Sequence, residues 1–271
     1  MSAIFVATDY SAISDNAAVY GAHLASQWGL ELKLIHAYFI PMTFNDPAIP
    51  MMPVDDLRHT SEERMAALSD KIKSDFPELK ITTLVEYGDI HDTLEDAIEE
   101  AQPALVIVGS HGSDDADMWM GSTTIDMLRN ANCPVLAVPP QAGFQPVRKI
   151  CLALDLSDEK SELPVEAIQQ LQNTSNAAVH LLHVQKVGEE AINALDNLPA
   201  VQQLKEIGIS VHLTQTAGEI DDKIASFAAE EGMQWLIVIP HHYSFWSALF
   251  HKSHTKAVVK RSQIPVLALH G

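Results

Sequence analysis

Residues 104–108 read Ala-Leu-Val-Ile-Val, an apolar stretch that no polar residue interrupts. A strand with one face in water alternates apolar and polar residues, so an unbroken run indicates a strand that is covered on both faces. The segment before it, 89–101, has a helical pattern and an acidic start, which the positive end of a helix dipole prefers. A buried strand preceded by an amphipathic helix predicts an α/β fold with a parallel sheet.

A similar run returns at 236–239 as Leu-Ile-Val-Ile, and further blocks recur in the same order in both halves of the chain. The paired blocks are 4–11 with 150–157, 34–37 with 181–184, 87–90 with 217–220, 105–109 with 236–240, and 133–138 with 264–269. The offset between partners falls once, from about 147 to about 131 residues, opposite the proline-rich segment 39–60. One deletion in a loop leaves the repeat intact, so we expect two copies of one unit.

Each copy alternates short apolar runs with longer amphipathic segments, and this order predicts strands that alternate with helices. Segment 11–28 is expected to form a helix, with Ser11 or Ser14 as its cap and Gly29 as its stop. A second acidic-led helix is expected at 219–231. The chain therefore predicts two tandem doubly wound parallel five-stranded sheets of the α/β class, with ligands at the carboxyl ends of the strands.

The boundary between the copies is expected where the composition becomes that of a linker. Residues 139–146 contain three prolines and a glycine and lack an apolar pattern. We therefore expect one domain over residues 1–143 and a second over residues 146–271.

Composition limits the classes of partner. Lys and Arg number 17 against 36 Asp and Glu, a formal net charge of −19. Nucleic acids and anionic membrane surfaces attract basic proteins, so we expect neither as a partner. No apolar run approaches the ~20 residues of a membrane span, and the N-terminal segment lacks the basic region of a signal peptide. With only Cys133 and Cys151 available for a disulfide, the chain is expected to be reduced and cytoplasmic.

A glycine-rich motif follows the run at 104–108. Gly109 and Gly112 precede a spacer of eight residues, after which Gly121, Ser122 and Thr123 are expected to open a helix. Glycine lets backbone N–H groups approach a phosphate closely, and the N-terminus of a helix favours an anion. The alternative is that the glycines only make a tight turn and a helix start.

This motif, the Cys-Pro-Val-Leu block at 133–136, the opening strand that ends at Asp9 and the Leu-Ile-His-Ala block at 34–37 resemble the universal stress protein family. The resemblance covers both halves and implies a tandem member with an adenine nucleotide alpha hydrolase-like, Rossmann-like fold. It implies a cytoplasmic stress-response factor that binds ATP or another adenine nucleotide in the first domain and is not an enzyme. Two alternatives stay open: a slow nucleotide hydrolase on the same fold, and an interaction scaffold without a ligand.

The resemblance also implies which residues hold the nucleotide. Asp9 would accept from a ribose hydroxyl, and the main chain at Ala37 would hold the adenine edge. The phosphates would lie against the glycine-rich motif, at Gly109, His111, Gly112, Gly121, Ser122 and Thr123. No catalytic residue is expected.

The spacer within the motif is acidic, since it holds Asp114, Asp115 and Asp117 and neither Lys nor Arg. Carboxylates repel a triphosphate unless a divalent cation lies between them. We therefore expect Mg²⁺ to accompany a nucleotide in the first domain.

The second copy departs from the motif, because Pro240 and Tyr243 stand where the first copy has Gly109 and Gly112. Proline lacks a backbone donor and tyrosine fills the space of a phosphate, so the same binding mode is not expected there. Four histidines gather in this region instead: His241, His242, His251 and His254. A three-residue spacing can share a metal, but packing is the favoured interpretation, and zinc is not expected at these four histidines.

The last strand of each copy is an apolar run, at 135–138 and 266–269. Single-domain members of the family commonly dimerise through this strand. An unpaired apolar edge also invites aggregation. We therefore expect the two halves to form an internal pseudo-dimer, which leaves a homodimer of chains allowed but not required.

Overall fold

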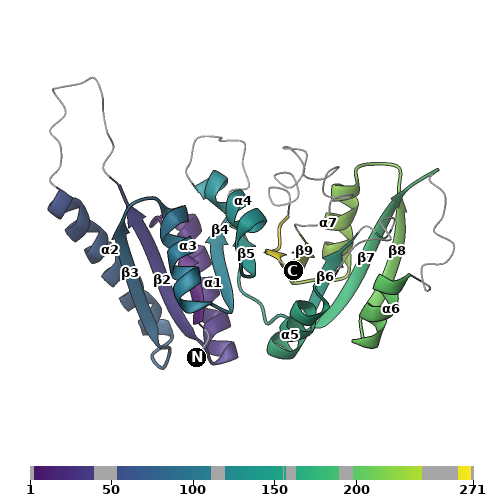
Figure 1. The fold of residues 1–271 in the computed structure, drawn as a ribbon, viewed down its shortest axis with the longest axis horizontal. Coiled ribbons are helices and arrows are strands. Elements are labelled where there is room, and N and C mark those ends of the chain that lie inside the picture. The colour runs from purple at the N-terminus through teal and green to yellow at the C-terminus, as the bar shows by residue number, and fades with distance from the viewer. Residues whose placement is uncertain are drawn as a thin grey trace, which may run out of the picture. The chain divides into compact units, whose positions relative to one another are not determined.

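The computed structural model describes residues 3–39, 54–110, 120–154, 156, 163–188, 198–239 and 262–269. Within it the chain forms two compact units, residues 1–109 and residues 110–271. Helices alternate with strands along both, as Figure 1 shows. The α/β class and the doubly wound arrangement predicted from the repeat are confirmed.

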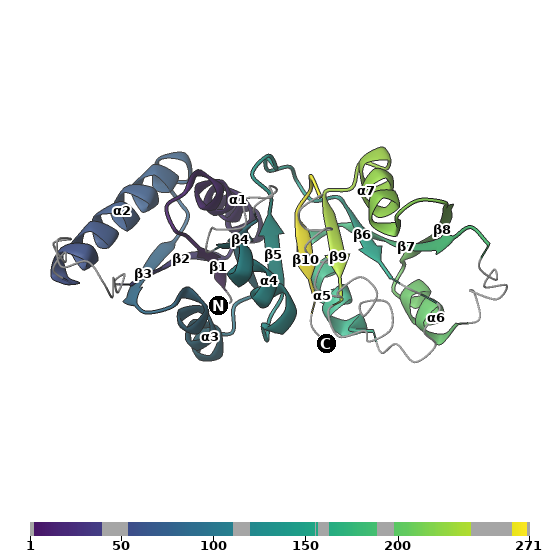
Figure 2. The same cartoon turned by 90° about the horizontal axis from the view of Figure 1, so that it is seen from above.

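The first unit is a parallel sheet with the strand order β3-β2-β1-β4. Its elements are β1 (Ala3–Ala7), α1 (Ala12–Trp28), β2 (Glu31–Tyr38), α2 (Val54–Asp75), β3 (Ile81–Tyr87), α3 (Ile90–Ala101) and β4 (Leu105–Gly109). Helices α1 and α2 lie on one face of this sheet and α3 on the other (Figure 2). From β1 the chain runs outward to β2 and β3 and then crosses back to β4. This reversal makes the carboxyl ends of β1 and β4 the position where such sheets bind ligands.

The second unit holds the strand order β5-β10-β9-β6-β7-β8. Its elements are α4 (Met120–Asn130), β5 (Val135–Val138), β6 (Lys149–Ala153), α5 (Val165–Ser175), β7 (Ala178–Lys186), α6 (Pro199–Glu206), β8 (Ser210–Thr216), α7 (Ile220–Glu230), β9 (Trp235–Val238) and β10 (Val266–Ala268). Strands β6 to β10 pair in parallel, so the second copy forms the five-stranded parallel sheet that the repeat predicts.

Strand β5 joins this unit through β10, and the two strands are antiparallel. Leu136 lies opposite Leu267, with Ala137 opposite Val266 and Val135 opposite Ala268. The two apolar runs expected to pair therefore do so. By their contacts, residues from 110 onward group with the second copy. The domain bounds 1–143 and 146–271 rest on the repeat and stay a prediction.

Local signals in the sequence explain where helices begin and end. Ser11, and not Ser14, is the N-cap of α1, and its side chain accepts from the Ser14 N–H at 3.2 Å. Gly29 ends the same helix in the left-handed region at φ 66°, which costs glycine no Cβ clash. Asp89 caps α3 by accepting from the His91 N–H at 2.8 Å.

The core lies between the sheets and their helices. Every residue of β4, β5 and β9 is buried, which is the pattern that the unbroken apolar runs predict. Burying one Leu, Ile or Phe side chain stabilises a fold by about 1.5–3 kcal/mol. Cys133 and Cys151 belong to this core, and burial raises the pKa of each thiol to about 12. No helix in the described ranges is long and apolar enough to cross a membrane.

Candidate functional site

The residues that the motif assigns to a ligand fall at strand ends and at a helix start. Asp9 follows β1, Ala37 lies near the end of β2, and Gly109 is the last residue of β4, all in the first unit. The backbone of 121–123 forms part of the first turn of α4, as expected of a helix start. His111 and Gly112 lie outside the described residues, as do the three spacer aspartates.

Asp9 is held as an anion by the turn that leads into α1. Its Oδ1 accepts from the Ser11 N–H at 3.0 Å and from the Ser14 hydroxyl at 2.7 Å. Partial burial would raise the pKa of the Asp9 carboxyl, but the hydrogen bonds from Ser11 and Ser14 outweigh burial and hold the pKa below its ordinary value. Both bonds use Oδ1, and the second carboxylate oxygen can accept a ligand hydroxyl.

Ser14 organises this turn, although the sequence pattern marks it only as a possible helix cap. The side chain is fully buried, and its oxygen lies 3.1 Å from the Thr8 hydroxyl as well as 2.7 Å from Asp9 Oδ1. A cluster of Thr, Asp and Ser directly after a buried strand is the sequence signal that points to such a network. Ser14 therefore fixes the orientation of the Asp9 carboxylate.

Tyr10 has a backbone conformation that few bulky residues adopt. Its φ is 61°, and its N–H donates to the Thr8 hydroxyl at 3.0 Å. The phenol hydroxyl donates to the carbonyl of Ser61 in α2 at 2.7 Å. Non-glycine residues with positive φ are uncommon and gather at functional sites, where surrounding contacts hold them.

His36 closes the same turn from β2. Its Nδ1 lies 2.7 Å from the Thr8 carbonyl oxygen, and because a carbonyl only accepts, Nδ1 carries a proton and donates it. Burial lowers the pKa of His36 and Arg64 lowers it further, although Thr8 and Asp9 act in the opposite direction. The neutral ring therefore keeps Nε2 as an acceptor. It packs against the Tyr10 ring with 4.3 Å between centroids.

Arg64 supplies a cation beside this turn. The residue lies on α2, and its guanidinium carbon is 6.0 Å from the centroid of the Tyr10 ring, within reach of a cation–π attraction. Its side chain is exposed. The spacer of the glycine-rich motif holds no cation, and no local sequence pattern connects α2 to the end of β1.

The backbone of Ala37 faces the side of β1, past the point where that strand ends. In a parallel sheet successive residues turn their N–H and C=O groups to alternate neighbours. Ile35 turns its carbonyl to β1, where it accepts from the Thr8 N–H at 2.9 Å. Ala37, two residues on, faces the same side, at a level where β1 has already ended at Ala7. The contact of Ala37 with an adenine edge stays a prediction.

Gly109 has a packing role that is independent of any ligand. A Cβ at this position would lie 2.8 Å from Ile13 Cγ2 and 3.3 Å from the Ile13 backbone. Its φ is outside the left-handed region, so close approach of α1, and not backbone freedom, explains this glycine. Packing against α1 therefore explains a glycine at this position without a ligand, and without the tight turn that the alternative expects.

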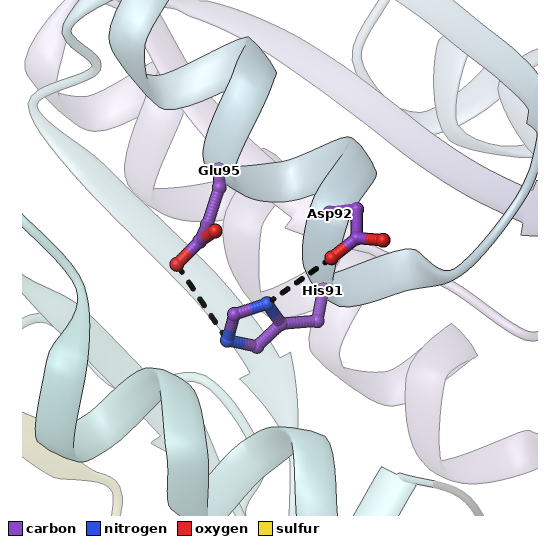
Figure 3. Close-up of side chains that lie close together, drawn as sticks. All are labelled: His91, Asp92 and Glu95. Atoms are coloured by element: carbon purple, nitrogen blue, oxygen red, sulfur yellow. Dashed lines mark ion pairs between the residues drawn. The ribbon is translucent and has the colours of Figure 1, made fainter.

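A cluster of potential metal ligands lies on α3, where His91, Asp92 and Glu95 offer atoms within 4.8 Å of one another (Figure 3). Asp92 lies 3.8 Å from Nδ1 of the imidazole, and Glu95 lies 3.7 Å from Nε2. Each carboxylate contacts a different nitrogen of the ring, whereas a shared ion would bind only one of the two nitrogens. With Asp92 and Glu95 side chains 82% and 53% exposed, we assign these contacts to helix-surface ion pairs. The four histidines of 241–254 lie outside the described residues.

Comparison with known proteins agrees with the fold. The model of the universal stress protein family matches residues 1–139 and again residues 146–270. Universal stress protein G of Shigella flexneri and that of Escherichia coli O157:H7 are each 29% identical to this chain over 84 residues. Those residues make up 31% of this chain, which covers 58% of the length of these relatives.

Solved structures share the fold over nearly the whole chain. A universal stress protein from Archaeoglobus fulgidus DSM 4304 is 18% identical with a TM-score of 0.73, and the match covers 99% of this chain and 96% of that one. A functionally unknown protein from Pseudomonas aeruginosa PAO1 is 16% identical with a TM-score of 0.59, over 100% and 92% of the two chains. Because the family model matches both repeats, the chain belongs to the universal stress protein family, as a tandem member.

Proposed function

We propose that the first repeat binds an adenine nucleotide and that the protein acts as a cytoplasmic stress-response factor without turnover. The observation that carries the proposal is the anionic Asp9 carboxylate, which Ser11 and Ser14 hold at the end of β1. Such a carboxylate accepts hydrogen bonds from ribose hydroxyls. Ala37 supports the proposal, since its backbone faces the same strand end from β2.

The phosphate end of the proposed site is the glycine-rich motif: Gly109, His111, Gly112, Gly121, Ser122 and Thr123. The start of α4 lies among these residues, and free N–H groups at a helix start favour phosphate. We propose Mg²⁺ as the accompanying ion because of the three spacer aspartates. Arg64 adds a positive charge beside the base and ribose end.

The test is calorimetry of the full chain with ATP, ADP and AMP, each with and without Mg²⁺. Saturable binding is expected, stronger for ATP with Mg²⁺ than without. Asp9→Asn keeps the acceptors for Ser11 and Ser14 but removes the charge, so binding should weaken about five- to tenfold. Gly121→Val should abolish binding by blocking backbone approach.

Ser253→Ala is the matched control, because Ser253 is the counterpart of Ser122 in the copy that has lost the motif. It should leave the affinity unchanged. Absence of binding at protein concentrations able to detect a millimolar ligand ends the proposal and favours the scaffold. Release of inorganic phosphate from bound ATP at a rate that Asp9→Asn or His111→Gln abolishes would favour the hydrolase instead.

A further inference from the structure

Two histidines meet on the sheet of the second unit, remote in sequence from the glycine-rich motif. His180 lies on β7 and His212 on β8, the strand at the end of the sheet order. The register pairs His180 with Ser210 and Leu182 with His212, so the two histidines are diagonal neighbours on one face. His180 Nδ1 lies 3.0 Å from His212 Nε2, with 5.2 Å between ring centroids.

The pair is held by rigid elements. Both rings are half-buried, and the Phe227 ring of α7 packs on His212 with 5.2 Å between centroids. Helix α7 covers β7 on this face. Side chains that project from paired strands and are packed from above lose little freedom when they bind a ligand, which favours a built site over a chance contact.

The protonation of the pair suits a metal. In an N–H···N contact between two imidazoles one ring nitrogen donates and the other accepts, so the accepting ring is neutral. Neutral imidazole is the form that ligates metals.

We propose that His180 Nδ1 and His212 Nε2 bind one divalent transition-metal ion, of the kind that takes imidazole nitrogens at right angles. Metal–nitrogen bonds of about 2.0–2.1 Å place two ligands about 2.9 Å apart at a right angle and about 3.3 Å apart in a tetrahedron. The observed 3.0 Å is nearer the first value, so Ni²⁺ or Cu²⁺ should bind more tightly than Zn²⁺. Each ring then carries its proton on the other nitrogen, and the neutral pair releases no proton.

Charges of both signs lie near the pair. Lys149 on β6 and Glu231 at the end of α7 both act on His180, with opposite signs. The Lys149 ammonium donates to the Glu231 backbone carbonyl at 3.1 Å, which holds it at that helix end. Water would complete the coordination, as in other sites with few protein ligands.

The test titrates the full chain with NiCl2 by calorimetry, with MgCl2 as the control ion. One equivalent should bind with micromolar affinity, and Mg²⁺ should not compete, since it prefers oxygen ligands. His180→Asn and His212→Gln keep a polar atom near the contact but remove the imidazole. Each should weaken Ni²⁺ binding at least tenfold.

Two control variants separate this site from the other histidines of the chain. His91→Gln removes the exposed cluster on α3, and the double variant His251→Gln/His254→Gln removes the spaced pair of the second copy. Both should keep the Ni²⁺ affinity within about twofold. If either control variant loses the tightly bound equivalent of Ni²⁺ while His180→Asn keeps it, the proposal is wrong.

A measurement on the unaltered chain covers the case in which the variants do not fold. Of the 13 histidines, the ring with a nuclear Overhauser contact to Phe227 identifies His212 in the proton spectrum. Substoichiometric Ni²⁺ should first broaden the resonances of the His212 ring and of its partner, His180. Broadening that begins at other rings and spares these two would overturn the proposal.

Discussion

The ends of β1 and β6 hold equivalent residues and use them differently. At the end of β1, the Thr8 hydroxyl accepts the Tyr10 N–H at 3.0 Å, and His36 Nδ1 donates to the Thr8 carbonyl at 2.7 Å. In the second repeat the equivalents are Leu154, Leu156 and His183. There the Leu156 N–H points to His183 Nδ1 at 3.2 Å, and the same nitrogen lies 3.2 Å from the Leu154 carbonyl.

One hydroxyl group explains the difference. Thr8 offers an acceptor to the N–H two residues on, which leaves the histidine free to donate to a carbonyl. Leu154 has no such group, so a backbone donor and a carbonyl compete for one ring nitrogen that can serve only one of them. The first repeat thus fixes the His36 imidazole with its proton on Nδ1, beside an anionic Asp9. When repeats diverge in function, a hydroxyl in the turn after a strand is therefore a feature to compare.

Filling the space at Gly109 should disrupt the first repeat most. Gly109→Val places a Cβ against Ile13, and overpacking of this kind costs about 1–3 kcal/mol of the free energy of unfolding. Urea denaturation measures the loss. Ile13→Ala in the same chain removes the methyl group that the new Cβ meets, so it should cost less in the Gly109→Val background than in the natural chain. Equal costs in the two backgrounds would rule out this contact as the cause.

Removing the Thr8 hydroxyl should make the first repeat resemble the second. Thr8→Val keeps the shape of the side chain but removes the hydroxyl that contacts the Tyr10 N–H and the Ser14 hydroxyl. The loss should cost about 1–2 kcal/mol of the free energy of unfolding. Denaturation gives the cost, and nitrogen-15 shifts of the His36 ring report its protonation. A fully stable variant with an unchanged His36 ring would show that the hydroxyl does not organise the turn.

The reciprocal change sharpens the comparison. Leu154→Thr offers the Leu156 N–H an acceptor and should release His183 Nδ1 to donate to the carbonyl of residue 154. The nitrogen-15 shift of His183 Nδ1 should then approach that of His36 Nδ1. A shift that stays where it is in the natural chain would mean that the surroundings of His183, and not the hydroxyl, set its form.

Asp9 should make stability depend on pH in a way that Asn does not. Its pKa in the fold is lower than the ordinary value of 3.8, so its ionised form stabilises the protein above about pH 4 and loses this contribution as the pH falls through the folded pKa. The carboxylate is partly exposed, which keeps the effect to about 1 kcal/mol or less. The unfolding free energies of the natural chain and Asp9→Asn should converge between pH 5 and pH 2, and a gap that widens with acid would contradict the argument.

The two cysteines, one in each repeat, should be equally unreactive toward a thiol reagent. Cys133 and Cys151 are buried with pKa values raised to about 12, so neither is a thiolate at pH 8. Both should resist a thiol reagent until urea unfolds the chain. Rapid labelling of one cysteine in the folded protein would show that its half opens locally.

The elements of the fold follow closely from apolar runs and caps. The run at 104–108 supplies most of β4 (Leu105–Gly109), Ser11 and Gly29 bound α1, and the internal repeat predicts the second parallel sheet. These features are local in sequence or recur at a fixed offset, which is why the sequence reveals them.

The site was predictable only in outline. Asp9 and Ala37 lie at strand ends, which a pattern can locate. The φ of Tyr10, the buried hydroxyl of Ser14 and the approach of Arg64 from α2 depend on how side chains and a distant helix pack. The His180–His212 contact depends on strand register, which the apolar pattern of β7 and β8 does not specify to the residue.

The antiparallel pair of β5 and β10 sets an order of events during synthesis. Leu136 can pair with Leu267 only after the ribosome has added that residue, 131 residues later by the numbering of the chain. At about 5–20 residues per second, that interval lasts roughly 7–26 seconds. The edge of β5 that β10 covers stays unpaired during this interval, so a nascent chain stalled before residue 266 should bind a chaperone more strongly than the finished protein.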